Sequence, residues 1–253
     1  MGTRGARWPP GVPLSPVGHS DQAPTDNVGR DQVENPGMTP PVDVAMRTTI
    51  VAVAGVGALL LVVAPRAARA LGTIAHESGH VIAGILTGHV IRYFEVTSGG
   101  EGGTLPATSR WGPGRIIMTL GGYVASPLFG LAGAALFNAG RIPLLLWTVV
   151  ALLVLALIKA EREWTTFVVL LLAAATAYVA LHGTPLLQTG FAAWLVWLLL
   201  FDGLVSALVA GKQKNTDPDR LFRDTLIPRT VWKAGFVVVA IVCLWKGVRL
   251  MAS

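Results

Sequence analysis

The sequence predicts an all-α, polytopic membrane protein of about six or seven transmembrane helices, with a short β-hairpin between the second and third helices. Composition is the first observation behind this fold class: 53% of the 253 residues are hydrophobic and only 13% are charged, with a mean hydropathy of +0.59. Soluble domains carry about 25% charged residues, so this depletion of charge indicates hydrocarbon surroundings. The second observation is a series of apolar segments close to the roughly 20 residues that a helix needs to cross a bilayer.

Residues 1–44 differ in composition from the rest of the chain. They contain eight of the sixteen prolines and show no helical or strand periodicity. Such a segment cannot bury enough apolar surface to fold, so we expect a disordered, Pro-rich cytoplasmic tail. Residues 45–253 then form the transmembrane domain.

Seven apolar segments follow the tail, and we expect each to be helical. Their ranges are 48–65, 71–88, 116–140, 142–158, 164–181, 188–211 and 230–250. Between the second and third segments, residues 90–110 combine strand-favouring side chains with the turn signal GGEGG, which predicts a strand or hairpin at the interface or inside the protein. The small residues of segment 121–136 predict close helix packing.

The basic residues predict how the chain lies in the cell membrane. Fifteen of the twenty Lys and Arg residues lie in the N-terminal tail and in the loops after the second, fourth and sixth helices. The positive-inside rule places that side, including the N-terminus, in the cytoplasm, and seven spans then put the C-terminus outside. Loops of this kind also account for the net charge of +6, so no nucleic-acid partner is expected.

The segment IAHESGHVIAG places three ionisable side chains in the second apolar helix. His76 and His80 are four residues apart, so both rings can face one metal ion, and Glu77 lies beside them. Zinc lowers the pKa of a bound water and the glutamate can accept its proton, so the spacing fits metal-assisted peptide hydrolysis. The only cysteine is Cys243, which leaves His, Asp and Glu as ligands.

A catalytic zinc usually takes three protein ligands, and Asp202 is the predicted third. Counted from the cytoplasmic ends of their helices, His76, His80 and Asp202 lie at similar depths, roughly 12–18 Å. The rival is Asp217, in the loop NTDPDRLFRD that we expect to be solvated. We expect no metal contact from the remaining histidines, which are His19, His89 and His182.

These features together resemble the site-2 proteases. The resemblance consists of the HExxH motif on an apolar helix, a strand-like segment, a Gly-rich helix and an intramembrane Asp-Gly. The Gly-Gly-Tyr helix and the stretch 216–232 look more like the divergent bacterial M-50 B-like branch, whose Ser-Asp pattern is similar to Thr216-Asp217.

The resemblance implies a zinc metalloendopeptidase that cleaves other membrane proteins in or near their transmembrane segments. Carried over residue by residue, it makes His76, His80 and Asp202 the Zn²⁺ ligands and Glu77 the general base. It also implies that an unwound substrate adds as a strand to the segment 90–104. Two alternatives stay open: a non-catalytic membrane scaffold or transporter that retains the fold, and a metal transporter that uses the same ligands.

Overall fold

The structure is a computed structural model that describes residues 44–63, 70–89, 91–96, 102–106, 112–159, 163–211 and 216–253. The tail predicted for residues 1–44 lies outside the described residues, apart from residue 44 itself. Within them, α-helices follow the predicted apolar segments closely. The elements are α1 (Val44–Val63), α2 (Ala70–Leu86), β1 (Ile91–Val96), β2 (Gly102–Pro106), α3 (Pro113–Asn138), α4 (Ile142–Lys159), α5 (Glu163–His182), α6 (Pro185–Val209), α7 (Asp217–Thr225) and α8 (Arg229–Ala252).

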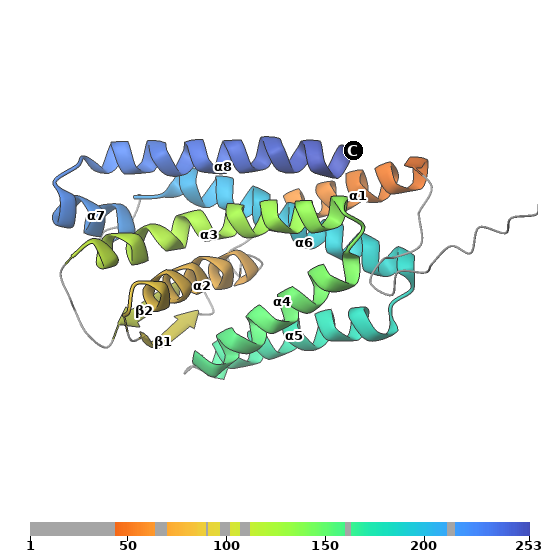
Figure 1. The fold of residues 1–253 in the computed structure, drawn as a ribbon, viewed down its shortest axis with the longest axis horizontal. Coiled ribbons are helices and arrows are strands. Elements are labelled where there is room, and N and C mark those ends of the chain that lie inside the picture. Colours follow the sequence, from red (N-terminus) through yellow and green to blue (C-terminus); the bar gives the residue numbers. More distant parts are fainter. Residues whose placement is uncertain are drawn as a thin grey trace, which may run out of the picture. The chain divides into compact units, whose positions relative to one another are not determined.

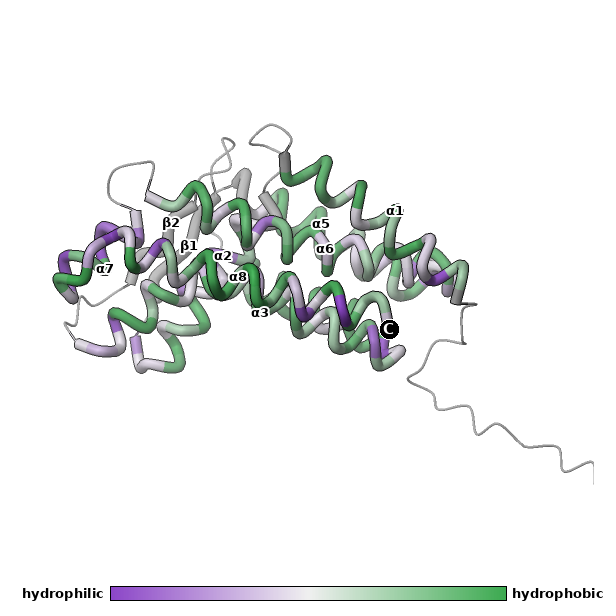
Figure 2. The backbone as a smooth tube through the Cα atoms, turned by 90° about the horizontal axis from the view of Figure 1, so that it is seen from above, coloured by the Kyte–Doolittle hydropathy of each residue, from purple (hydrophilic) through white to green (hydrophobic). Residues whose placement is uncertain are grey.

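The predicted number of transmembrane helices is wrong. Within the described ranges, four helices are long and apolar enough to cross a membrane: α1, α3, α6 and α8. The apolar parts of α4 and α5 are shorter, and α2 has 17 residues, so at 1.5 Å per residue each of these is about 26 Å long against a hydrocarbon core of about 30 Å. Hydrophobic residues nevertheless make up much of the bundle, whereas hydrophilic residues gather on α7 (Figure 2).

The region between α2 and α3 contains two short strands. β1 and β2 pair antiparallel, with Phe94 opposite Thr104, and the register shifts between Ile91 and Tyr93. Both strands contact α2, near the end of the bundle where α3 begins (Figure 1).

Helix directions follow from close approaches at glycines. Gly130 lies against Leu200 and Gly203 against Pro127, so α3 and α6 are antiparallel. In the same way α2 is antiparallel to α3, since Gly79 meets Ala125 and Gly114 meets His89, and α1 is parallel to α6, since Gly55 meets Trp197 and Gly190 meets Ile50. It follows that α1 and α2 run in the same direction and are not two successive crossings of a membrane.

This arrangement brings the start of α1 and the end of α8 to the same end of the bundle. Arg47 Nη2 donates to Asn138 Oδ1 at 3.4 Å, and Ser253 Oγ donates to the same oxygen at 3.1 Å. The seven-span prediction, which placed the two termini on opposite sides, is therefore wrong for the described helices. Its error was to count the α2 segment as a separate return crossing. We call the opposite end, where α7 lies and where α3 and α8 begin, the site end (Figure 1).

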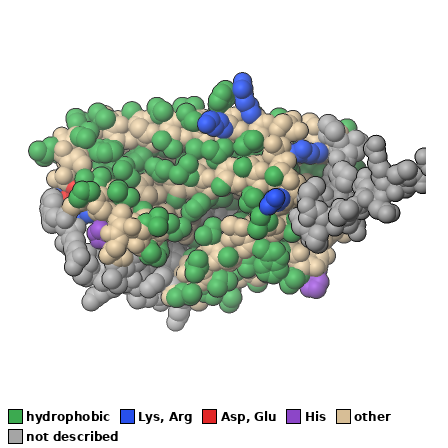
Figure 3. Space-filling view, viewed as in Figure 1, with side chains coloured by type: hydrophobic (Ala, Val, Ile, Leu, Met, Phe, Trp, Pro, Cys, Tyr) green, Lys and Arg blue, Asp and Glu red, His purple; other side chains and the backbone are tan. Residues whose placement is uncertain are grey.

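Small residues hold the helices of the core close together, as predicted for 121–136. A Cβ on Gly79 would lie 2.3 Å from the Gly121 carbonyl oxygen, so α2 and α3 pack with their backbones nearly in contact. The outward faces are apolar instead: hydrophobic side chains are spread over the face seen in Figure 3 with few charged side chains among them, as expected for helices in contact with lipid.

Candidate metal centre

The α2 helix presents the two motif histidines on one face. Their ring centroids are 4.8 Å apart and their Nε2 atoms 3.2 Å apart. His80 is buried, and its Nδ1 lies 2.8 Å from the Met118 carbonyl oxygen of α3. Since a carbonyl only accepts, Nδ1 carries the proton of the neutral ring, which leaves the Nε2 lone pair free to bind a metal. The structure therefore brings the His76 and His80 rings together, and their role as metal ligands stays a prediction.

Asp217 completes a triangle with these rings. Its Oδ2 atom lies 3.2 Å from His76 Nε2 and 3.1 Å from His80 Nε2. Among the described residues, His76, His80 and Asp217 form the one group of three or more His, Cys, Asp or Glu side chains that could hold an ion. The loop carboxylate that the depth argument disfavoured therefore lies beside the histidines.

Local sequence explains how Asp217 reaches a buried position. Thr216 and Asp219 form a capping box, in which the Thr216 backbone N–H donates to Asp219 Oδ2 at 3.0 Å. This box starts the nine-residue helix α7, and Leu226 ends it in the left-handed conformation. Leu221, on the inner side of α7, is fully buried in a cluster with Ala207, Phe236 and Ala240. The segment expected to be a solvated loop is thus an amphipathic helix folded back onto the bundle.

Asp202, the predicted third ligand, lies outside the group that His76, His80 and Asp217 form. It is buried in α6, where Ser126 Oγ donates to its Oδ2 at 3.2 Å and where it packs against Gly72, one turn before His76 on α2. The depth estimate placed it at nearly the right height. Height along a helix axis, however, does not fix the direction of a side chain around that axis, and the estimate could not resolve one turn.

The donor set and its spacing fit zinc. Tetrahedral zinc, with bonds of about 2.0–2.1 Å, separates its ligand atoms by about 3.3 Å, and the three edges here are 3.1–3.2 Å. Two imidazoles and one carboxylate are ligands typical of a catalytic zinc. A cradle for the ion is also present, because a Cβ on Gly122 of α3 would lie 2.4 Å from His80 Nε2 and 2.6 Å from His76 Nε2.

The charge of Asp217 is favoured by its neighbours. Burial favours the neutral carboxyl. In the zinc-free protein, however, attraction to a protonated His80 ring and hydrogen bonds from both histidines outweigh it, so the pKa of Asp217 lies well below its usual range. Its second oxygen, Oδ1, lies 3.3 Å from Arg220 Nη1. The site therefore offers an ionised carboxylate, the form that binds a metal.

Two further residues frame the site. Glu77, the predicted general base, follows His76 on α2 and is buried. Tyr123 of α3 meets the His76 ring edge-on, with centroids 4.7 Å apart, and stacks on Phe236 of α8. Sequence reasoning gave no role to Tyr123 or Gly122, although their place in the Gly-Gly-Tyr stretch pointed to this helix.

The two other histidines that the structure describes are not part of the triangle. His89 is buried after α2, with Nδ1 3.0 Å from the Thr87 hydroxyl, and His182 ends α5 beside Tyr178. His19 lies outside the described residues.

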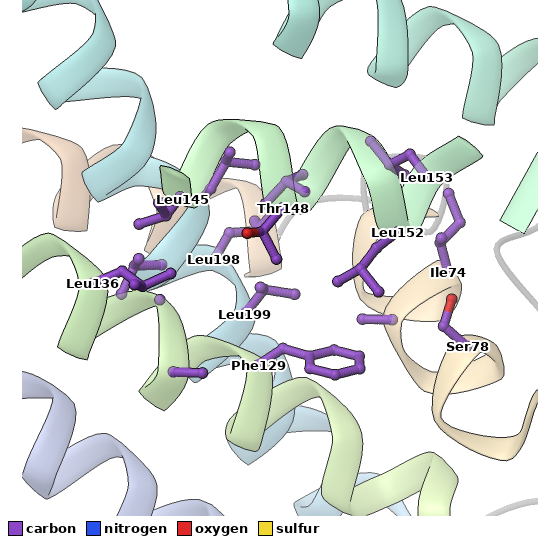
Figure 4. A pocket seen from close by; sticks show the side chains of 16 residues that line it. Ile74, Ser78, Phe129, Leu136, Leu145, Thr148, Leu152, Leu153, Leu198 and Leu199 are labelled. Atoms are coloured by element: carbon purple, nitrogen blue, oxygen red, sulfur yellow. The ribbon is translucent and has the colours of Figure 1, made fainter. Parts of the chain in front are cut away.

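The reverse face of α2 borders an apolar cavity of about 130 Å³, lined by side chains of α2, α3, α4 and α6. Ile74 and Ser78 reach it from α2, and Phe129, Thr148 and Leu198 line it from the other helices (Figure 4). At 100° per residue, Ser78 projects nearly opposite to His76. The serine of the motif thus faces the cavity and not the triangle.

Comparison with known proteins identifies a family. The family model described as Peptidase M50B-like matches residues 49–247, which include α2 with its motif, Asp202 and all of α7. No curated protein and no solved structure matches the chain significantly.

Proposed function

The chain belongs to the Peptidase M50B-like family, and from this premise we propose that it is an intramembrane zinc metalloprotease. Its substrates would be membrane proteins, cleaved in or near a transmembrane segment. The observation that carries the proposal is the triangle of His76, His80 and Asp217, whose edges suit a zinc ion. The described part of the chain also contains four candidate membrane spans.

In this proposal His76, His80 and Asp217 hold the zinc. When bound there, zinc supplies Lewis-acid chemistry that acidifies water and polarises a peptide carbonyl. The Glu77 carboxylate takes the proton of the attacking water and returns it to the departing amine nitrogen. Met118 keeps His80 in the tautomer that the site needs, and Arg220 holds the outer oxygen of Asp217.

The strands next to α2 suit the presentation of a peptide. A protease needs an extended backbone at its site, and a transmembrane helix must unwind to provide one. We infer that an unwound substrate segment adds to β1 or β2, where backbone groups at a strand edge supply the pairing.

The helix directions and the basic residues together support a proposal for the membrane orientation. Segments 90–115, 159–162 and 212–233, which connect elements at the site end, contain eleven of the twenty Lys and Arg residues. Four belong to the opposite end, which are Arg47, Arg141, Lys246 and Arg249. Two lie between α1 and α2, and the remaining three lie in segment 1–43. By the positive-inside rule we infer that the site end faces the cytoplasm and that the start of α1 faces outward, the reverse of the sequence-based orientation for the N-terminus.

The orientation is tested with Ser253→Cys in intact cells. A membrane-impermeant maleimide should label this variant from outside, while Cys243 is buried and provides little background. Labelling only after the cells are opened would contradict the orientation.

The function is tested on the purified full chain in nanodiscs. We expect about one zinc per chain, loss of that zinc in His76→Ala, and loss of peptide cleavage with zinc retained in Glu77→Gln. If Glu77→Gln keeps both zinc and full cleavage, Glu77 is not the base. If the wild type binds zinc but cleaves no membrane-protein substrate, a non-catalytic metal-binding protein of the same fold replaces the proposal.

A further inference from the structure

The helix that supplies Asp217 is short and is held in place by contacts with other helices. α7 has nine residues, too few to be stable alone in water, so tertiary contacts must fix its position. One contact is apolar, through the buried side chain of Leu221. Two ion pairs also tie α7 to neighbouring helices, one near each end of α7.

The two ion pairs differ in burial and in partner helix. Near the start of α7, Asp219 Oδ1 lies 2.8 Å from Arg229 Nε at the beginning of α8, and the Arg229 side chain is 60% exposed. Near its end, Asp224 Oδ2 lies 2.9 Å from Arg115 Nε of α3, with side chains that are only 4% and 25% exposed. The second pair is more shielded from water, so its attraction is screened less.

Arg115 belongs to the part of α3 that already shapes the site. Met118, three residues later, accepts the hydrogen bond from His80, and Gly122, seven residues later, leaves the space beside both Nε2 atoms. This spacing repeats along one face of a helix. One face of α3 therefore contacts the histidines of α2 directly. Through Arg115 the same face forms an ion pair with α7, the helix that bears Asp217.

We propose that Arg115 is a positioning residue of the metal site: through Asp224 it holds α7 so that Asp217 stays within reach of both histidines. The inference rests on the proposed zinc site but not on catalysis. Groups that orient metal ligands from outside the coordination shell typically change metal affinity by about 10–100-fold. Loss of the Arg115 guanidinium should also leave the Asp224 carboxylate buried without this partner, which favours release of α7.

The experiment measures zinc affinity of the full chain in nanodiscs, by competition with a zinc chelator, for Arg115→Met, Arg115→Lys and the exchanged pair Arg115→Asp with Asp224→Arg. Arg223→Met is the matched control, since it removes an equal charge from an exposed position of α7. Amide hydrogen exchange of residues 216–225 in the zinc-free protein is measured on the same samples.

We expect Arg115→Met to weaken zinc binding by about 10-fold or more and to speed exchange across α7, with Arg115→Lys and the exchanged pair recovering part of both and Arg223→Met changing neither. Equal zinc affinity and equal exchange in Arg115→Met and wild type would overturn the positioning role while leaving the zinc site intact. If the wild type binds no zinc, the proposed function fails. Faster amide exchange of α7 in Arg115→Met than in the wild type would then still support the role of Arg115 in holding α7, and unchanged exchange would overturn that role.

Discussion

Asp202 and Asp217 are both buried carboxylates, but they occupy opposite kinds of structure. Asp202 lies in the apolar helix α6, where it accepts a hydrogen bond from Ser126 and packs on Gly72. Asp217 begins the polar helix α7 and faces two histidines and an arginine. The comparison teaches that an ionisable residue inside a span need not lie beside the histidines of the motif. A short amphipathic segment outside the spans can bring in the carboxylate instead.

The largest expected effect comes from replacing the Asp217 carboxylate with an amide. Asp217→Asn should lower zinc affinity by roughly 100-fold or more, because a charged ligand is lost from the triangle. Zinc content after dialysis against a chelator measures this. Retention of zinc with wild-type affinity would show that Asp217 is not a ligand.

A comparable loss is expected from Gly122→Ala. The added methyl group would occupy the space beside both Nε2 atoms, so the ion should be excluded or bound on the order of 100-fold more weakly. The matched control is Gly235→Ala in α8, where a Cβ meets nothing within 4 Å. It should leave zinc unchanged and stabilise the helix by up to about 1 kcal/mol.

A smaller effect is expected from Asp202→Asn, and it should fall on stability. The amide oxygen can still accept from Ser126, so zinc affinity should stay within about threefold and the free energy of unfolding should change by about 1 kcal/mol. Denaturant titration and zinc competition measure the two quantities. If Asp202→Asn abolished zinc binding, the assignment of zinc binding to Asp217 and not to Asp202 would be wrong.

The smallest effect is expected at Ser78, inside the motif itself. Its side chain lines the apolar cavity behind α2, so Ser78→Ala should change zinc affinity by less than about twofold. A large loss of zinc would mean that this face of α2 contributes to the site.

Sequence reasoning predicted the helices and two of the three triangle residues, because apolar runs and the i, i+4 histidines are local patterns. It missed α7, although Thr216 and Asp219 have the spacing of a capping box. Leu221 and Phe222 are the two large apolar residues of this otherwise polar segment, which gave only a weak helical signal. It also missed that α1 and α2 are parallel. Hydropathy identifies helices but not their directions, and those depend on contacts such as Gly55 with Trp197 that link distant parts of the chain.

The most direct test of the central claim is the position of zinc in an experimental structure, located by anomalous scattering at the zinc absorption edge. The account predicts one strong peak about 2.0–2.2 Å from His76 Nε2, His80 Nε2 and an Asp217 oxygen. A peak coordinated by Asp202, or the absence of zinc between the two histidines in a zinc-saturated crystal, would contradict it.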